Sequence, residues 1–136
     1  MFNLDKKNVL ITGASGGIGQ EIASNMHKAG ASLAISGQNI DVLQGLSSDL
    51  GKGVEVVPSN LSDLDSVNNL ALDAAKALGG DIDILINNAG ITRDNLIMRM
   101  KEEDWNRIIN VNLTSTFILS RSVLRPMMKK KWGRII

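Results

Sequence analysis

Residues 9–30 read VLITGASGGIGQEIASNMHKAG, and this stretch decides the fold. It begins with an apolar run, continues through a glycine-rich turn at residues 13–19, and then carries Ile22, Ala23 and Met26 at helical spacing. This order predicts a buried strand, a tight turn and a helix. Because the N–H groups of the turn and the positive end of the helix dipole face the same point, the stretch favours binding of a phosphate or diphosphate.

Length and composition set the bounds. A chain of 136 residues allows one domain, and its net charge of +1 argues against nucleic acid as the main partner. The chain has no cysteine, so disulfides and thiolate chemistry are excluded. No run approaches the ~20 apolar residues of a membrane span, and residues 1–13 lack the apolar core of a signal peptide. We therefore expect a cytoplasmic protein that does not associate with membranes.

Strand-like and helix-like segments alternate along the chain. Apolar runs at residues 9–11, 32–35, 54–57 and 82–86 are separated by amphipathic segments, and a fifth strand opens at residues 133–136. This alternation predicts an α/β fold with a doubly wound parallel sheet, Rossmann-like in type. We expect residues 1–136 to form a single, incomplete domain, the first half of that fold. In such a half-sheet the first strand is expected to lack a neighbour across the switch point and apolar faces to be exposed.

A second motif follows the fourth apolar run. A glycine-rich turn alone is compatible with a plain strand-to-helix connection. Here, however, residues 12–19 have the spacing TGxxxGxG, and Asn87-Asn88-Ala89-Gly90 comes later in the chain. These two motifs, in this order, resemble those of the short-chain dehydrogenase/reductase family. The resemblance covers nearly the whole chain but only the first half of the family's fold.

The resemblance implies a nicotinamide dinucleotide cofactor and no metal. The cofactor-binding positions that it implies are Gly13, Ser15, Gly16, Ile18, Gln38, Asn60, Leu61, Asn88, Ala89 and Gly90. Gln38 stands where NAD-specific members commonly carry an acid that bonds the ribose. Without that acid nothing repels a 2′-phosphate, so we predict NADP as cofactor. NAD stays open, because the arginine of NADP-preferring members is also missing from its usual positions.

Asn112 is the candidate catalytic residue, since it matches the asparagine that the family uses in a proton relay and that interrupts a helix. From the residues alone, Asn112 reads as a helix cap. The family's reaction also needs a serine, a tyrosine and a lysine whose charge lowers the pKa of the tyrosine. The chain contains no tyrosine, so these residues cannot complete the reaction by that mechanism.

Residues 91–100 with Trp105, and the ending at residues 127–136, resemble one branch of the family, the bacterial 3-oxoacyl-acyl-carrier-protein reductases. This resemblance implies that the complete protein reduces 3-oxoacyl-acyl-carrier protein to the (3R)-hydroxyacyl form with NADPH, in fatty-acid biosynthesis. It also implies a homotetramer formed in part by the helix after Asn112. Two alternatives stay open: a short-chain reductase of a free ketone or polyol, and a truncated, non-catalytic fragment that binds nucleotide or subunits.

Cations gather near the end of the chain, at Lys129, Lys130, Lys131 and Arg134. On charge alone, the simpler interpretation is a solvated helix end whose cations complement the helix dipole. The resemblance favours a second interpretation, in which this basic patch receives the acidic acyl-carrier protein.

Overall fold

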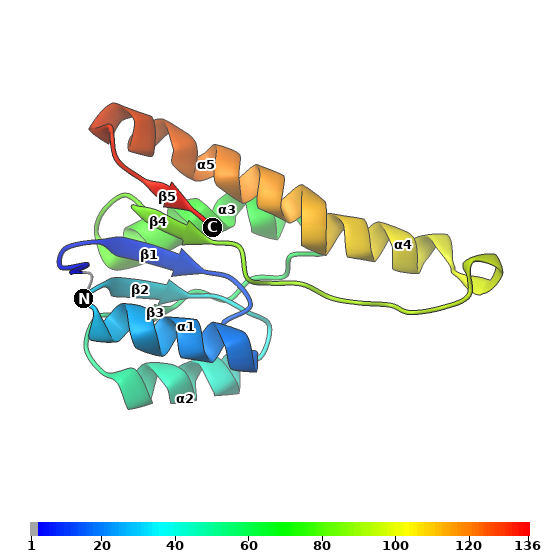
Figure 1. The fold of residues 1–136 in the computed structure, drawn as a ribbon, viewed down its shortest axis with the longest axis horizontal. Helices are drawn as coiled ribbons and strands as arrows, with labels where there is room; N and C mark the ends of the chain where they lie inside the picture. Colours follow the sequence, from blue (N-terminus) through cyan, green and yellow to red (C-terminus); the bar gives the residue numbers. More distant parts are fainter. Residues whose placement is uncertain (1–2) are drawn as a thin grey trace.

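A five-stranded parallel sheet with helices on both faces is the core of the computed structural model, which describes residues 3–136 (Figure 1). The strands are β1 (Asn8–Ile11), β2 (Ser32–Ile35), β3 (Val54–Val56), β4 (Ile84–Ile86) and β5 (Arg134–Ile135). The helices are α1 (Gly17–Lys28), α2 (Ile40–Leu50), α3 (Leu64–Leu78), α4 (Glu102–Ile109) and α5 (Ser115–Lys130), with a 3₁₀ turn η1 (Ile97–Arg99) and a π-helical turn η2 (Asn110–Thr114).

The strand order is β3-β2-β1-β4-β5, so the predicted doubly wound α/β fold is confirmed. The order reverses beside β1, which pairs in parallel with β2 on one side and β4 on the other. The expectation that the first strand lacks a neighbour across the switch point is therefore wrong. After α3 the chain crosses to the free side of β1, where Leu10 pairs with Leu85.

Each face of the sheet has its own apolar core. Leu10 and Leu85 point to the face covered by α3 and α5, whereas Val9 and Ile11 point to the face that packs against α1 and α2. This division follows from the period of two in a strand, which sends successive side chains to opposite faces. Because helices lie on both faces, the inner strands are apolar at nearly every position.

The face on the side of α1 is the less completely covered one. A hollow of about 940 Å³ runs from α1 to β5, and Ile22, Met26, Trp132 and Ile136 are among its lining residues. Ile136 is 68% exposed, and Ile18 at the start of α1 is 74% exposed. The expectation that the sheet leaves apolar surface exposed is confirmed.

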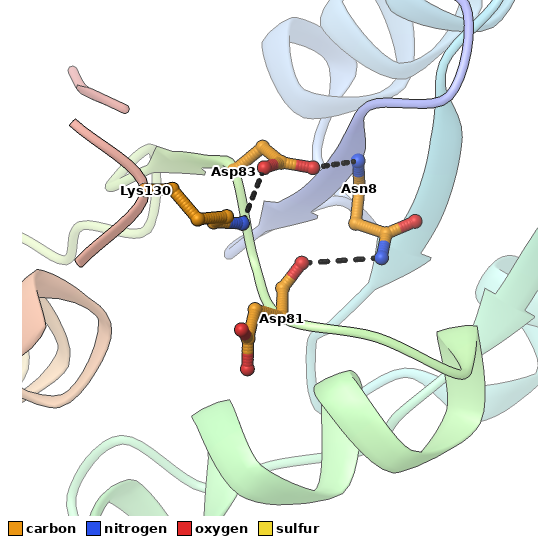
Figure 2. Close-up of polar contacts among 4 residues, drawn as sticks. All are labelled: Asn8, Asp81, Asp83 and Lys130. Atoms are coloured by element: carbon orange, nitrogen blue, oxygen red, sulfur yellow. Dashed lines mark hydrogen bonds and ion pairs between the residues drawn. The ribbon is translucent and has the colours of Figure 1, made fainter. Parts of the chain in front are cut away.

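Polar side chains join the elements at the amino ends of the strands (Figure 2). The Asp83 carboxylate accepts a hydrogen bond from the Asn8 N–H at 2.9 Å and pairs with Lys130 Nζ at 2.6 Å. The Asn8 side chain donates to the Asp81 carbonyl at 3.1 Å. The Lys7 ammonium lies over the Trp132 ring, and its Nζ is 3.9 Å from the ring centre. This cluster therefore links β1, the start of β4 and the end of α5.

Helix boundaries follow local chemistry. Asn39 caps α2 through Val42 N–H, and Asp63 caps α3 through Asp65 N–H, as residues of these types do. Gly79 ends α3 with a left-handed φ of 72°, which favours glycine. Across the described part of the chain, every helix is too short or too polar to cross a membrane.

Candidate functional site

The glycine turn after β1 is the centre of the site. Gly13 has a φ of +63°, and a side chain there would lie 2.7 Å from Ala89 Cα. A side chain at Gly19 would lie 2.7 Å from Ala14 Cα. Real Cβ atoms do not approach this closely, so both positions require glycine. The motif spacing is thus explained by the contact between the turn, the first turn of α1 and the loop after β4.

The start of α1 presents unpaired donors. The N–H groups of Gly17, Ile18 and Gly19 have no acceptor among residues 3–136, and Gly16 supplies no side-chain cap. The first N–H groups of any helix lack partners within it, and the helix dipole adds positive potential there. A Cβ added at Gly17 would meet no atom within 4 Å, and residues 16–19 line a hollow of about 230 Å³, so there is open space at the start of α1. This geometry suits a phosphate or diphosphate.

The loop after β4 is tied to the glycine turn by side chains. Asn88 Nδ2 donates to the carbonyls of Thr12 and Gly13, both at 3.1 Å. The Thr12 hydroxyl accepts the Ala89 N–H at 3.1 Å and donates to the Ile86 carbonyl at 3.3 Å. Thr12 is only 2% exposed, so these bonds are shielded from water. They fix the two motifs relative to each other before any ligand binds.

Two adjoining hollows lie along these loops. The glycine hollow, of about 230 Å³, is lined by Gly13, Gly16, Gly17, Ile18, Gly19, Asn88, Ala89 and Gly90. The strand hollow, of about 170 Å³, is lined by Gly13, Ser15, Gly37, Gln38, Ser59, Leu61, Ser62, Ala89, Gly90, Ile91, Arg107 and Val111. Because Gly13, Ala89 and Gly90 line both, the hollows form one strip across the carboxyl ends of β1, β2 and β4. An elongated ligand with a charged centre fits this strip.

The carboxyl ends of β2 and β3 are joined at the outer part of the strip. The hydroxyls of Ser36 and Ser59 are 2.8 Å apart and buried, and Gln38 Nε2 donates to Asn60 Oδ1 at 2.9 Å. Asn60 Oδ1 also accepts the Ser62 N–H at 3.0 Å. These contacts hold Gln38 and Asn60 beside the strand hollow, where an aromatic ring or a ribose has polar partners.

Asn112 lies in the middle of the π-helical turn η2, between α4 and α5. Its Oδ1 accepts the Ile91 N–H and its Nδ2 donates to the Ile91 carbonyl, each at 2.8 Å. The expected interruption of a helix at Asn112 is confirmed, and the helix-cap interpretation is not. Single π-helical turns inside α-helices are frequent at functional sites. Here the turn directs Asn112 toward the loop that lines the strip.

Comparison with known proteins agrees with this geometry. The family model for short chain dehydrogenases matches residues 7–136. The chain belongs to the short-chain dehydrogenase family. It is 46% identical to nodulation protein G of Rhizobium sp. (strain N33) over all of its length and 55% of that protein's. It is also 46% identical to the 3-oxoacyl-[acyl-carrier-protein] reductase FabG of Escherichia coli (strain K12), with 99% of this chain and 55% of that protein covered.

A solved structure of a short chain dehydrogenase/reductase family protein superposes with a TM-score of 0.89 at 31% identity, covering 98% of this chain and 55% of that one. The chain thus spans about half the length of the relatives that it matches. The fold and the motifs of this family are present over that half.

The residues that the family resemblance predicts to bind the cofactor lie together. Gly13, Ser15, Gly16, Ile18, Gln38, Leu61, Asn88, Ala89 and Gly90 line the strip, and Asn60 lines the surface beside it. Asn88 differs from the rest, because its amide points at the glycine turn and ties the loops. Asn112 lies next to the strip, since a Cβ added at Gly90 would be 3.4 Å from its Oδ1.

Three contributions were not found from the sequence. The Thr12 hydroxyl had a signal, because it opens the first motif, but its role as a tie needs the fold. The contact of Ser36 with Ser59 and the position of Arg107 at the strand hollow join segments far apart in sequence. No sequence pattern predicts these two contacts.

The predicted basic patch lies at the other end of α5. Helix α5 runs from η2 back to the amino ends of the strands, and its 16 residues span about 24 Å (Figure 1). Lys130 is engaged by Asp83 at 2.6 Å, and the Arg134 guanidinium lies over Trp132. Lys129 and Lys131 are exposed. Among residues 3–136, no group of three His, Asp or Glu side chains is arranged to hold a metal.

Proposed function

We propose that the strip binds a nicotinamide dinucleotide, and that the complete protein is an NADPH-dependent 3-oxoacyl-acyl-carrier-protein reductase. The observation that carries the proposal is the pair of tied loops, which leave free N–H donors at the start of α1 beside an elongated hollow. Membership of the short-chain dehydrogenase family and the identity to reductases of this name support the choice of cofactor and reaction.

The chain's own residues would bind and orient the cofactor. The N–H groups of Gly17 and Ile18 hold the diphosphate, with Gly13 and Gly16 allowing its close approach. Ser15, Gln38, Asn60 and Leu61 lie along the adenosine, and Ala89 and Gly90 lie beside the nicotinamide ribose. When bound, the cofactor supplies the hydride that reduces a carbonyl carbon.

In this proposal, the Asn112 side chain positions a loop and does not contact the cofactor. Both polar atoms of its side chain are used by Ile91, so the side chain holds the loop after β4 against the strip. Its backbone carbonyl accepts the Thr116 hydroxyl at 3.0 Å. A proton relay through Asn112 would therefore use this carbonyl.

The relatives named as 3-oxoacyl-[acyl-carrier-protein] reductases support the proposed substrate and partner. In the proposal, an acidic acyl-carrier protein in the cytoplasm presents the 3-oxoacyl thioester, and the product is the (3R)-hydroxyacyl thioester. Lys129, Lys131 and Arg134 supply the docking charge, whereas Lys130 is held by Asp83. Such charges raise association rates more than they raise affinity.

A homotetramer is part of the proposal. Leu113 of η2 and three residues of α5, Phe117, Leu124 and Met128, recur at spacings that place them along one side, and all are between 46% and 68% exposed. An apolar stripe of this kind marks a protein interface. If α5 forms the interface, Phe117→Asp in the complete protein reduces the mass measured by light scattering to that of a smaller species.

One assay separates the candidate functions. The complete protein is assayed in three mixtures: NADPH with acetoacetyl-acyl-carrier protein, NADPH with a free ketone, and NADP⁺ with a polyol. We expect oxidation of NADPH with the carrier-bound thioester, at a kcat/KM at least tenfold above that for the free ketone. Turnover of the free ketone or polyol alone would contradict the substrate, and binding of NADPH without any turnover would support the non-catalytic alternative.

A further inference from the structure

The Arg107 side chain is the one basic group among the residues lining the outer part of the strip. Arg107 belongs to α4, far in sequence from the glycine turn, yet it lines the strand hollow together with Gly37 and Gln38. It also lines the two surface hollows that adjoin it, one with Gln38, Asn60 and Ser62, and one with Gly37, Gln38 and Asn60. Arg107 therefore lies beside the carboxyl ends of β2 and β3.

Arg107 has no protein partner for its charge. Among residues 3–136, the ion pair between Lys130 and Asp83 is the only one within 4.0 Å, and no hydrogen bond of the Arg107 side chain is formed. Glu103, one helical turn earlier, lines one of the surface hollows but makes no ion pair with Arg107. An exposed, unpaired arginine has all five donors free for a ligand.

Apart from the Glu103 carboxylate, the other groups that line these hollows around Arg107 are neutral. Gln38 and Asn60 are joined to each other by a hydrogen bond of 2.9 Å, so part of their capacity is already used. A dinucleotide whose diphosphate lies at the start of α1 places its adenosine in the strand hollow, at the end of β2. There a 2′-hydroxyl meets Gln38, whereas a 2′-phosphate brings two negative charges that neutral amides satisfy poorly. Arginine recognises such a phosphate with paired hydrogen bonds.

Resting on the proposed dinucleotide site, we propose that Arg107 of α4 discriminates NADPH from NADH by pairing with the 2′-phosphate of the adenosine ribose. The cation that is missing next to the glycine turn and after β2 is thus supplied across the strip by another helix. Gln38 and Asn60, held together, form the neutral floor beside which the phosphate lies. In this arrangement NADP preference depends on the packing of α4, not on the β2 loop alone.

Calorimetric titration of the complete protein tests the proposal with NADPH, NADH, 2′,5′-ADP and 5′-AMP. The variants are Arg107→Gln, Arg107→Lys and, as a control of equal charge change, Arg125→Gln on the exposed part of α5. We expect Arg107→Gln to lower the affinity for NADPH and for 2′,5′-ADP by about 10- to 100-fold. The affinities for NADH and 5′-AMP should stay within twofold of the wild-type values. Arg107→Lys keeps the charge but loses the paired N–H donors of the guanidinium. Its affinity for NADPH should lie between those of the wild type and Arg107→Gln. Arg125→Gln changes none of the four affinities.

Salt gives a second readout. Raising ionic strength should weaken 2′,5′-ADP more in the wild type than in Arg107→Gln, because the variant has lost the charge pair. Equal losses for NADPH and NADH in Arg107→Gln would overturn the proposal, since they indicate a general role in shaping the site. Unchanged NADPH affinity would overturn it as well. If the wild type binds none of the four ligands, the dinucleotide site itself fails, which is a separate result.

Discussion

The two ends of the parallel sheet use polar side chains in opposite ways. At the amino ends of the strands, the Asp83 carboxylate, the Lys130 ammonium and the Asn8 N–H satisfy one another (Figure 2). At the carboxyl ends, Thr12 and Asn88 bond the backbone of neighbouring loops, and the N–H groups that begin α1 have no partner among residues 3–136.

This difference shows how one sheet separates stability from binding. Where Asp83 pairs with Lys130 and accepts the Asn8 N–H, these contacts hold β1, β4 and α5 together. Where side chains fix the backbone and leave donors free, the chain gains a preformed ligand site at low cost on binding. Substitutions at the carboxyl end should therefore lower ligand affinity, whereas substitutions at the amino end should lower the free energy of unfolding and leave ligand affinity nearly unchanged.

The largest effect is expected for Gly19→Val at the carboxyl end. The new side chain overlaps Gly13 and Ala14, so the turn must move away from the start of α1. We expect NADPH affinity, measured by calorimetry, to fall by at least about 100-fold. Gly45→Ala in α2 is the control, because a Cβ there meets no atom within 4 Å and alanine favours a helix. Undiminished NADPH binding by folded Gly19→Val would contradict the site.

A smaller effect is expected for Asn88→Ala. The variant loses the hydrogen bonds to the Thr12 and Gly13 carbonyls, so the loop after β4 is no longer held against the glycine turn. We expect NADPH affinity to fall by about tenfold and the free energy of unfolding by about 1–2 kcal/mol. Asn87→Ala is the matched control, since the hydrogen bond of residue 87 to Ile136 uses its backbone N–H. Equal losses in both variants would indicate a general loop effect.

The sequence predicted the carboxyl end better than the amino end. Glycines with fixed spacing are demanded by contacts within one strand-turn-helix unit, so the turn at residues 13–19 could be predicted from local pattern alone. The doubly wound sheet followed from the alternation of segments, but the neighbours of β1 did not, because the crossover after α3 is decided by packing. The expected free strand is instead paired with β4.

Contacts between distant segments were beyond the pattern. Lys130 reads as one of a run of cations, and only the fold brings it to Asp83, 47 positions away in sequence. Arg107 has no motif around it, and only the fold brings it to the strand hollow. In both cases the side chain's role depends on how α4 and α5 return across the sheet, which no local spacing encodes.

The opposite pattern of effects is expected for Asp83→Asn at the amino end. Burial raises the pKa of Asp83, but the Asn8 N–H and the Lys130 ammonium lower it by more, so the pKa lies below its ordinary value of 3.8. A carboxylate with a lowered pKa stabilises the fold above its unfolded pKa, and this contribution is lost as pH falls through the folded pKa. Asp83→Asn should therefore be less stable than the wild type at pH 7, and the difference should shrink below pH 3.8.

The expected loss at pH 7 is about 1–2 kcal/mol in urea unfolding, because Lys130 is 37% exposed and solvent screens the pair. NADPH affinity should change less than twofold. Asp81→Asn is the control of equal charge, since residue 81 contacts Asn8 through its backbone carbonyl. If Asp81→Asn destabilises the fold as much as Asp83→Asn, the change in net charge explains the effect and the contacts of Asp83 with Lys130 and Asn8 do not.

Amide chemical shifts measured while NADPH is added to the protein test the central claim most directly. We expect large changes in chemical shift for Gly17, Ile18, Ala89 and Gly90 at the carboxyl ends of the strands, and none for Lys7, Asp83 or Trp132. Saturating NADPH that leaves the amides at the start of α1 unchanged, or that shifts the amino end instead, would contradict it.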